Sequence, residues 1–125
     1  MPSPHSTPEL QSFGAVPDTQ LERTLREQQI LLDSAGVGIV FMRQRVLVRC
    51  NPRYAEIFGY ASPQQIIGLS SEVLYPSREE FRELGRSAYP TMARGQTYRV
   101  ERQMRRCNGE LFWGNLTVRL INPLD

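Results

Sequence analysis

The stretch VLVRCNPRYAEIFGY, residues 46–60, joins a short apolar strand to a helix without a spacer. Its first part alternates between aliphatic residues and Arg, and this period of two is typical of a half-buried strand. Val46, Val48 and Cys50 are therefore expected on one face of a sheet. The chain then passes from this sheet into a helix that lies across it.

The helix is indicated by its two ends. Asn51 is a preferred N-cap, since its side-chain oxygen accepts a backbone N–H of the first turn, and Pro52 has no N–H to leave unpaired. Tyr54 and Phe58 fall on one side at helical spacing, and Gly59 supplies the left-handed residue that commonly ends a helix. The pattern predicts a short helix with one buried side.

The composition limits the class of protein. The chain has 125 residues, enough for one domain with a single core. All 15 basic residues are Arg, but 13 acidic residues nearly balance them, and the Arg residues of segment 97–106 alternate between two faces of a strand. This distribution argues against nucleic-acid binding. The sequence has no apolar run of about 18 residues and no signal-peptide pattern, so we expect a cytoplasmic domain without membrane contact.

Two segments precede the strand-helix unit. Residues 1–17 are rich in Pro, Ser and Thr and include the only histidine, His5, so we expect disorder there. Residues 18–35 have the pattern of an amphipathic helix. Its stripe follows a 4-3-4-3 spacing and consists of Leu21, Leu25, Gln28, Leu32 and Ala35. The stripe either packs on the domain itself or forms the seam of a helix-pair dimer, in which the polar Gln28 sets the register.

The remaining elements have equally local signals. They are a buried strand at 38–42 that forms a hairpin with 46–50, a short helix after Ser62, a longer helix from Ser77 to Gly95, and long strands at 97–106 and 110–121. Asn108-Gly109 between the long strands fits a two-residue type I′ turn. The order of these elements predicts an α+β fold, in which an antiparallel sheet carries helices on one face.

From about Leu31 to its end the chain resembles a PAS domain of the bacterial sensory-box kind. The order and spacing of several motifs carry the likeness: Gly38-Ile39-Val40-Phe41, Cys50-Asn51-Pro52-Arg53-Tyr54 with Phe58-Gly59-Tyr60, Gly95 to Glu101, and Arg106-Cys107-Asn108-Gly109-Glu110 with Phe112-Trp113. The predicted leading helix fits as well, since PAS domains are commonly preceded by an amphipathic helix that mediates dimerisation or passes signals. The resemblance implies a profilin-like sheet with short helices on one face, over residues 36–125.

The resemblance also implies a fifth strand that this sequence lacks at its C-terminal end. In a PAS sheet the last strand lies in the middle, between the first strand and the long hairpin, and the sequence stops at Asp125, where that strand is due. A sheet with two unpaired central edges attracts another strand. We therefore expect either a C-terminally truncated domain or a replacement strand, taken from another chain or from the N-terminal segment. A homodimer or an arrangement in which a strand or segment is swapped is predicted.

The function implied by the resemblance is sensing. PAS domains hold a small ligand, or none, between the inner sheet face and the short helices. They relay changes to output domains such as the histidine kinases of two-component systems or the GGDEF and EAL enzymes of cyclic-di-GMP turnover. We expect a regulatory sensor or dimerisation module without catalytic residues; a ligand-free protein-interaction module is the alternative. A small α+β enzyme is less favoured, because a single His leaves no Ser-His-Asp or Cys-His arrangement and no metal cluster.

No cofactor is identifiable from the sequence. Haem-binding relatives use a His on the helical side of the pocket, but no His follows His5. The flavin-binding photosensory branch needs a Cys on the helix after the first hairpin, and no Cys lies between Cys50 and Cys107. His-ligated haem and cysteinyl-flavin chemistry are therefore disfavoured, whereas an unknown small ligand is compatible with the sequence. We expect both cysteines to be free thiols, buried or half-buried.

The expected pocket follows from strand parity and helical phase. Its candidate residues are Phe41, Tyr54, Phe58, Ile67, Phe81, Tyr98, Val100, Arg102, Phe112 and Leu116. Arg102 is the one charged side chain among them: either its stem packs while the guanidinium reaches the rim, or it binds an anionic ligand. Trp113 lies on the opposite face. We expect it to pack with the leading helix or across a dimer seam that includes Leu21, Leu25, Gln28 and Leu32.

Overall fold

Five strands form one sheet, and helices pack against it. The computed structural model describes residues 7–14 and 36–120. Along the chain the elements are β1 (Glu9–Gly14), β2 (Gly38–Arg43), β3 (Val46–Cys50), α2 (Pro52–Ile57), the short 3-10 helices η2 (Pro63–Gln65) and η3 (Ser71–Leu74), α3 (Arg78–Ala93), β4 (Tyr98–Arg105) and β5 (Leu111–Leu120). The strands lie in the order β3-β2-β1-β5-β4. The predicted α+β fold is confirmed.

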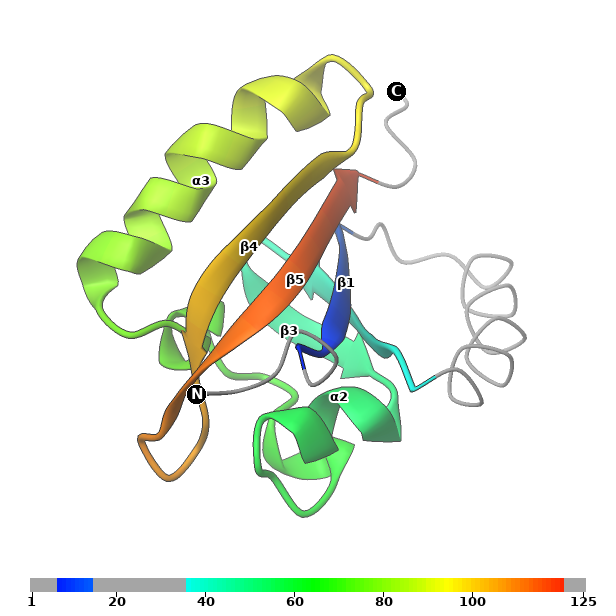
Figure 1. The fold of residues 1–125 in the computed structure, drawn as a ribbon. Helices are drawn as coiled ribbons and strands as arrows, with labels where there is room; N and C mark the ends of the chain where they lie inside the picture. The colour runs from blue at the N-terminus through cyan, green and yellow to red at the C-terminus, as the bar shows by residue number, and fades with distance from the viewer. Residues whose placement is uncertain (1–6, 15–35, 121–125) are drawn as a thin grey trace, which may run out of the picture.

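The central strand of the sheet is β1, which comes from the N-terminal part of the chain. It pairs in parallel with β2 on one side and with β5 on the other, so that Leu10 lies opposite both Gly38 and Leu116. Figure 1 shows β1, in blue, beside the red strand β5. The prediction of disorder for residues 1–17 is therefore wrong for residues 9–14. The place that a PAS sheet gives to its last strand is filled from the N-terminus, and the sheet is mixed.

Leu10 explains why β1 fits this place. Its side chain, only 1% exposed, lies in a slot between Gly38 of β2 and Gly114 of β5. A Cβ atom at Gly38 would lie 3.1 Å from one Leu10 methyl group, and a Cβ atom at Gly114 would lie 3.0 Å from the other. At the start of the strand, Glu9 Oε2 accepts a hydrogen bond of 2.8 Å from Asn115 Nδ2. Composition could not indicate this strand, because a single fully buried side chain anchors it.

The hairpin of β2 and β3 contains a bulge that changes the predicted faces. The register between the two strands shifts within the hairpin. Leu47 and Cys50 are both buried, whereas Val46 and Val48 are 36% and 37% exposed. The prediction that Val46, Val48 and Cys50 share one face is wrong, because the extra residue of a bulge reverses the alternation of side chains.

The turns of the two hairpins are of different kinds. Gln44 and Arg45 join β2 to β3 with φ angles of 51° and 64°, the left-handed values that a type I′ turn requires at both central positions. Between β4 and β5, the Arg106 N–H donates to Glu110 O at 2.8 Å, and Gly109 has a φ of 92°. The two-residue turn predicted there is thus a three-residue loop with Gly109 in the left-handed position.

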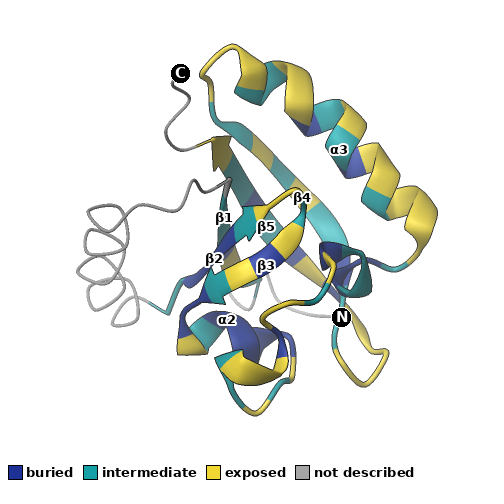
Figure 2. Cartoon of the chain, turned by 180° about the vertical axis from the view of Figure 1, so that it is seen from behind, coloured by how far each residue is buried: buried dark blue, intermediate teal, exposed yellow. Residues whose placement is uncertain are grey.

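The core lies between the sheet and helices α2 and α3. As predicted, Tyr54 and Phe58 are buried, and their ring centroids lie 4.9 Å apart. Helix α3 buries Leu84 and Ala88, while its outer side is exposed, as Figure 2 shows. This helix contacts β4 and β5, so it covers that half of the sheet.

Candidate functional site

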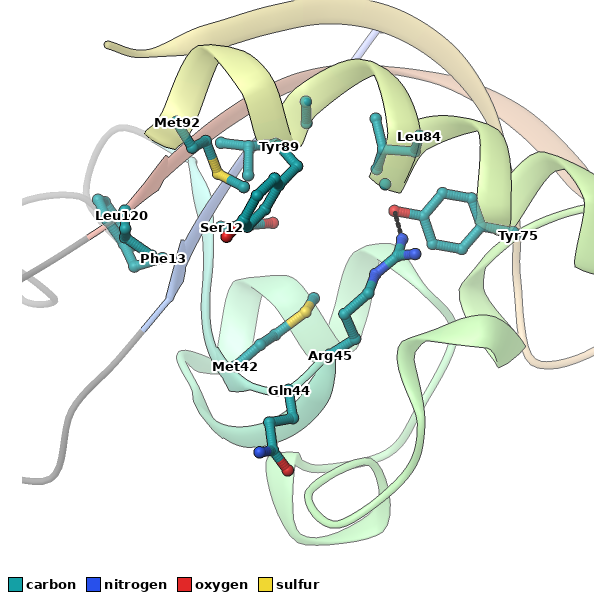
Figure 3. Close-up of a pocket in the computed structure, with 13 residues that line it drawn as sticks. Ser12, Phe13, Met42, Gln44, Arg45, Tyr75, Leu84, Tyr89, Met92 and Leu120 are labelled. Atoms are coloured by element: carbon teal, nitrogen blue, oxygen red, sulfur yellow. Dashed lines mark hydrogen bonds between the residues drawn. The ribbon is translucent and has the colours of Figure 1, made fainter. Parts of the chain in front are cut away.

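A cavity of about 260 Å³ lies between α3 and the central strands of the sheet (Figure 3). Its walls come from β1, β2, β5, α3, the turn between β2 and β3, and the segment that precedes α3. The lining residues are Ser12, Phe13, Met42, Gln44, Arg45, Tyr75, Leu84, Gly85, Ala88, Tyr89, Met92, Val118 and Leu120. Because β1 supplies part of the wall, the cavity is complete only while the N-terminal strand is in place.

Most of the lining is apolar. Leu84 and Ala88 reach the cavity from α3, and Met42 reaches it from β2. The polar side chains Arg45 and Tyr75 lie together at one end of the cavity in Figure 3. An apolar hollow with a few convergent polar groups is the usual composition of a small-molecule site.

Arg45 is held at this end of the cavity by its backbone and by three contacts. Its left-handed φ, in the turn, directs the side chain toward α3. Nη1 donates to Phe81 O at 2.7 Å, Nη2 lies 3.5 Å from the Tyr75 hydroxyl, and the guanidinium carbon is 3.7 Å from the centroid of the Phe81 ring. Gly85 leaves the necessary room, since a Cβ atom there would lie 2.8 Å from Arg45 Nη1. The guanidinium is therefore fixed in both position and plane.

Burial raises the pKa of two tyrosine hydroxyls and of one thiol, of which the Tyr75 hydroxyl lines the cavity. It raises the pKa of Tyr75 above the ordinary value, and the adjacent Arg45 opposes this shift only in part. The pKa of Tyr54 is raised as well, mainly by burial, although a hydrogen bond with Ser12 acts in the opposite direction. The pKa of the Cys50 thiol is raised to about 11 by burial. At neutral pH Tyr75 is thus a phenol that can donate a hydrogen bond into the cavity.

Comparison with known proteins agrees with this architecture. Residues 34–123 match the family described as the PAS domain. The chain belongs to the PAS domain family. It is 32% identical, over 94 residues, to the Sensor protein TdiS of Thauera aromatica; this match covers 75% of the chain and 17% of that protein. The chain therefore spans a small part of the curated relative.

Two solved PAS domains are similar in structure. One belongs to a LuxR-family transcriptional regulator of Burkholderia thailandensis and was solved in complex with ethanol. It has 40% sequence identity and a TM-score of 0.59, with 64% of this chain and 69% of that chain covered. The other, from Colwellia psychrerythraea, has 18% identity and a TM-score of 0.61, with 72% and 75% covered, and it supports the fold alone.

The family is one of sensory modules rather than catalytic domains, and the relatives are a sensor and a regulator. This PAS domain is accordingly a sensory signalling module and not an enzyme. Within residues 7–14 and 36–120, no helix is both long enough and apolar enough to cross a membrane.

The ten residues predicted to line the pocket lie elsewhere in the PAS domain. None of them lines the cavity beneath α3. Tyr54, Phe58, Phe112 and Leu116 are buried core residues, whereas Phe81, Tyr98 and Val100 are half-buried. Parity identified core positions correctly, but it could not distinguish the packed part of the core from the hollow part.

Two of these candidates depart further from the prediction. Phe41 is buried and its ring stacks on that of the cavity-lining Phe13, with centroids 5.0 Å apart, but Phe41 itself does not reach the cavity. Ile67 is 39% exposed, while its neighbour Ile66 is 0% exposed. The predicted helical phase is wrong by one residue at this point, because the segment forms a 3-10 helix rather than an α-helix.

Arg102 and Trp113 line a second, more open hollow between the start of α3 and β4. Arg102 Nη1 forms a salt bridge of 2.8 Å with Glu80 Oε1, so the domain itself supplies an anionic partner for this side chain. Trp113 is 46% exposed. The other predicted seam residues, Leu21, Leu25, Gln28 and Leu32, lie outside the described residues.

Sequence reasoning missed the polar end of the cavity. No sequence signal marks Arg45, because neither its left-handed backbone nor its reach to Phe81 is visible in the sequence. Leu84, Ala88 and Met92 lie at helical spacing in the predicted helix from Ser77 to Gly95, yet only the structure shows that they border a hollow. Of the two cysteines, Cys50 is buried but Cys107 is exposed, in contrast to the prediction.

Proposed function

We propose that this domain senses a small organic ligand, bound in the cavity beneath α3, for a bacterial signal-transduction protein. The observation that carries the proposal is the cavity itself: about 260 Å³ of mostly apolar space with two polar side chains at one end. Its size favours a small molecule over haem or flavin. The solved relative in complex with ethanol is a PAS domain that takes a small molecule.

The position of β1 suggests a route for the signal. Ser12 and Phe13 line the cavity, and their strand precedes residues 18–35, the predicted amphipathic helix. A ligand that contacts β1 changes how firmly this strand is held in the sheet. The change would pass along the chain to an output domain, for which a histidine kinase or an enzyme of cyclic-di-GMP turnover is the expected class. We place the protein in the cytoplasm, where both cysteines stay free thiols.

Filling the cavity tests the proposal. Ala88 lines the cavity and is 2% exposed, so Ala88→Leu places added side-chain volume in the hollow. We expect thermal shifts with benzyl alcohol and 1-hexanol in the wild-type protein, and at least a roughly tenfold loss of affinity in Ala88→Leu, about 1.4 kcal/mol. Ala93→Leu, an exposed position on the same helix, is the matched control and should bind like wild type. Equal affinity in Ala88→Leu and wild type would contradict the proposed site.

We also propose that the domain forms a homodimer through the predicted seam of Leu21, Leu25, Gln28 and Leu32, with Trp113 nearby. The seam's 4-3-4-3 spacing and the 46% exposure of Trp113 support this. Dimerisation without a ligand remains the alternative function of the domain. In the swapped form of this dimer, β1 of each copy would pair with β2 and β5 of the other copy.

The dimer is tested by sedimentation. Leu25→Glu is expected to convert dimer to monomer, because it places a charge in an apolar seam, whereas Arg23→Glu, on the opposite side of the predicted helix, should leave the dimer intact. Trp113 is the only tryptophan, so its emission reports whether the seam lies near it. A wild-type protein that sediments as a monomer at high concentration would refute this arrangement.

A further inference from the structure

We propose that the ligand of the cavity beneath α3 is a small carboxylic acid with an apolar tail, whose carboxylate is bound by Arg45 and Tyr75. The inference rests on the proposed function, because it concerns the same cavity. It adds the chemical class of the ligand, and four features of the cavity point to it.

The first feature is the conformation of Arg45. This residue has a φ of 64°, a left-handed conformation that costs a residue with a side chain on the order of 1–2 kcal/mol. The type I′ turn imposes this conformation, which Gln44 shares. The hydrogen bond to Phe81 O and the Phe81 ring beneath the guanidinium then fix the charged end of the side chain. The result is a cation presented at the end of an apolar hollow.

The second feature is the charge of Arg45, which is not balanced. Among the described residues, no carboxylate lies within salt-bridge distance of its guanidinium. The acidic residues of α3 are paired elsewhere: Glu79 and Glu83 with Arg86, and Glu80 with Arg102. A half-buried cation beside apolar surface is costly unless an anion accompanies it. The cavity therefore lacks one negative charge, and a ligand can supply it.

The third feature is the set of hydrogen-bond donors. A guanidinium carries five N–H groups, and the two contacts of Arg45 to Phe81 O and Tyr75 leave others available. Tyr75 accepts from Arg45, and its raised pKa keeps its own O–H as a donor. Two donors that converge beside one another match the two oxygens of a carboxylate.

The fourth feature is the rest of the lining. Met42, Leu84, Ala88, Met92 and Val118 give the cavity an apolar body. Its volume of about 260 Å³ is near the lower limit of ligand pockets, roughly 300 Å³. This apolar part of the cavity suits the tail of a small aliphatic or aromatic acid. The residues that line the cavity include no second cation that could bind a phosphate or a dicarboxylate.

The test compares acids with neutral molecules of the same shape. The probes are hexanoate, octanoate, benzoate and phenylacetate, each beside its primary alcohol, with affinities measured by calorimetry or ligand-observed NMR. In the wild-type protein we expect at least one acid to bind about tenfold more tightly than its alcohol, as a charge-assisted pair predicts. Arg45→Met and Tyr75→Phe should each reduce this ratio toward one while the affinity for the alcohol stays within about threefold.

One control variant, Arg43→Met, and the choice of Tyr75→Phe as the second test variant keep the test decisive. Arg43→Met changes an exposed Arg of the same hairpin and should preserve the acid-to-alcohol ratio. Tyr75→Phe retains the ring that packs edge-to-face on Phe81, so it reads out the hydroxyl even if Arg45→Met loosens the fold. If alcohols bind the wild type as tightly as acids, the carboxylate inference fails while the proposed site stands. If the ratio persists in both variants, the inference also fails. If no probe binds the wild type, both fail.

Discussion

Deletion of residues 1–14 is expected to abolish the cooperative unfolding of the domain. These residues contain β1, which pairs with β2 on one edge and with β5 on the other. Without it, both central edges of the sheet lose their partners and the slot that holds Leu10 opens to water. The stability of a small domain is only about 5–15 kcal/mol, and a central strand with a buried Leu accounts for a large share of that. We expect a chain that associates through its open edges or lacks a melting transition.

Circular dichroism during thermal and urea unfolding, together with sedimentation, measures this effect. Deletion of residues 1–6 is the matched control, because it removes N-terminal chain and leaves β1 intact. A synthetic peptide of residues 1–17, added to the longer deletion, should restore the transition, whereas the same peptide with Leu10→Asp should not. A deletion of residues 1–14 that melts cooperatively as a monomer, with wild-type stability, would show that β1 does not hold the sheet together.

The sequence could predict those parts of the fold that depend on local signals. The capped helix after Asn51, the stripe of α3 and the hairpin closed near Gly109 each need only a few consecutive residues, and each is present. The gap in the centre of the sheet was also visible, once the order of elements resembled a PAS domain. The N-terminal segment was one of the two sources considered for the replacement strand.

The assignment of β1 could not be made from local signals. The sequence ELQSFG has one fully buried residue, Leu10, and its neighbours in the sheet are far away in the sequence. The segment forms a strand because Leu10 fits a slot between Gly38 and Gly114. The sequence around these glycines does not indicate that Leu10 packs against them. Composition therefore favoured disorder where tertiary contacts decide the outcome.

The candidate site was predicted less well than the fold, for a related reason. Strand parity selects inward-facing residues, and a bulge in the β2–β3 hairpin breaks that parity. Most inward-facing residues pack in the core. The cavity lies where the side chains of α3 and of the sheet do not fill the space between them, and the sequence does not show this place. Arg45 reaches that hollow through a left-handed turn residue, which the sequence does not specify.

Replacement of Asn51 by Ala is expected to lower the free energy of unfolding by about 3–5 kcal/mol. Asn51 is 0% exposed. Its Oδ1 accepts from the N–H groups of Ile39 (3.0 Å) and Tyr54 (2.9 Å), and its Nδ2 donates to Val37 O (2.9 Å). One amide therefore starts α2 and ties it to β2. Its loss removes this partner from the Ile39 N–H and from Val37 O, while the Tyr54 N–H keeps only the backbone oxygen of residue 51, at 3.1 Å. Each buried polar group left without a partner costs about 1–3 kcal/mol.

An ordinary helix cap provides the comparison. Ser77 caps α3 by accepting from the Glu80 N–H at 3.2 Å, in an exposed position, so Ser77→Ala should cost only about 1 kcal/mol. Urea unfolding of both variants at one temperature gives the two values. If Asn51→Ala is no more destabilising than Ser77→Ala, then Asn51 acts as a cap alone and the tie to β2 contributes nothing.

Asn51→Asp separates the two functions of the amide. The Asp keeps an oxygen for the N–H groups of Ile39 and Tyr54, but an ionised carboxylate faces Val37 O, where the Asn donated a hydrogen bond. The protonated acid can restore that donor, so the folded state should raise the pKa of this carboxyl above its usual value of about 4. A raised pKa contributes stability below the unfolded value and loses it as the pH increases through the folded value. Relative to wild type, Asn51→Asp should therefore be less destabilised in mildly acidic buffer than at neutral pH, and a pH-independent difference would mean that the donor to Val37 does not matter.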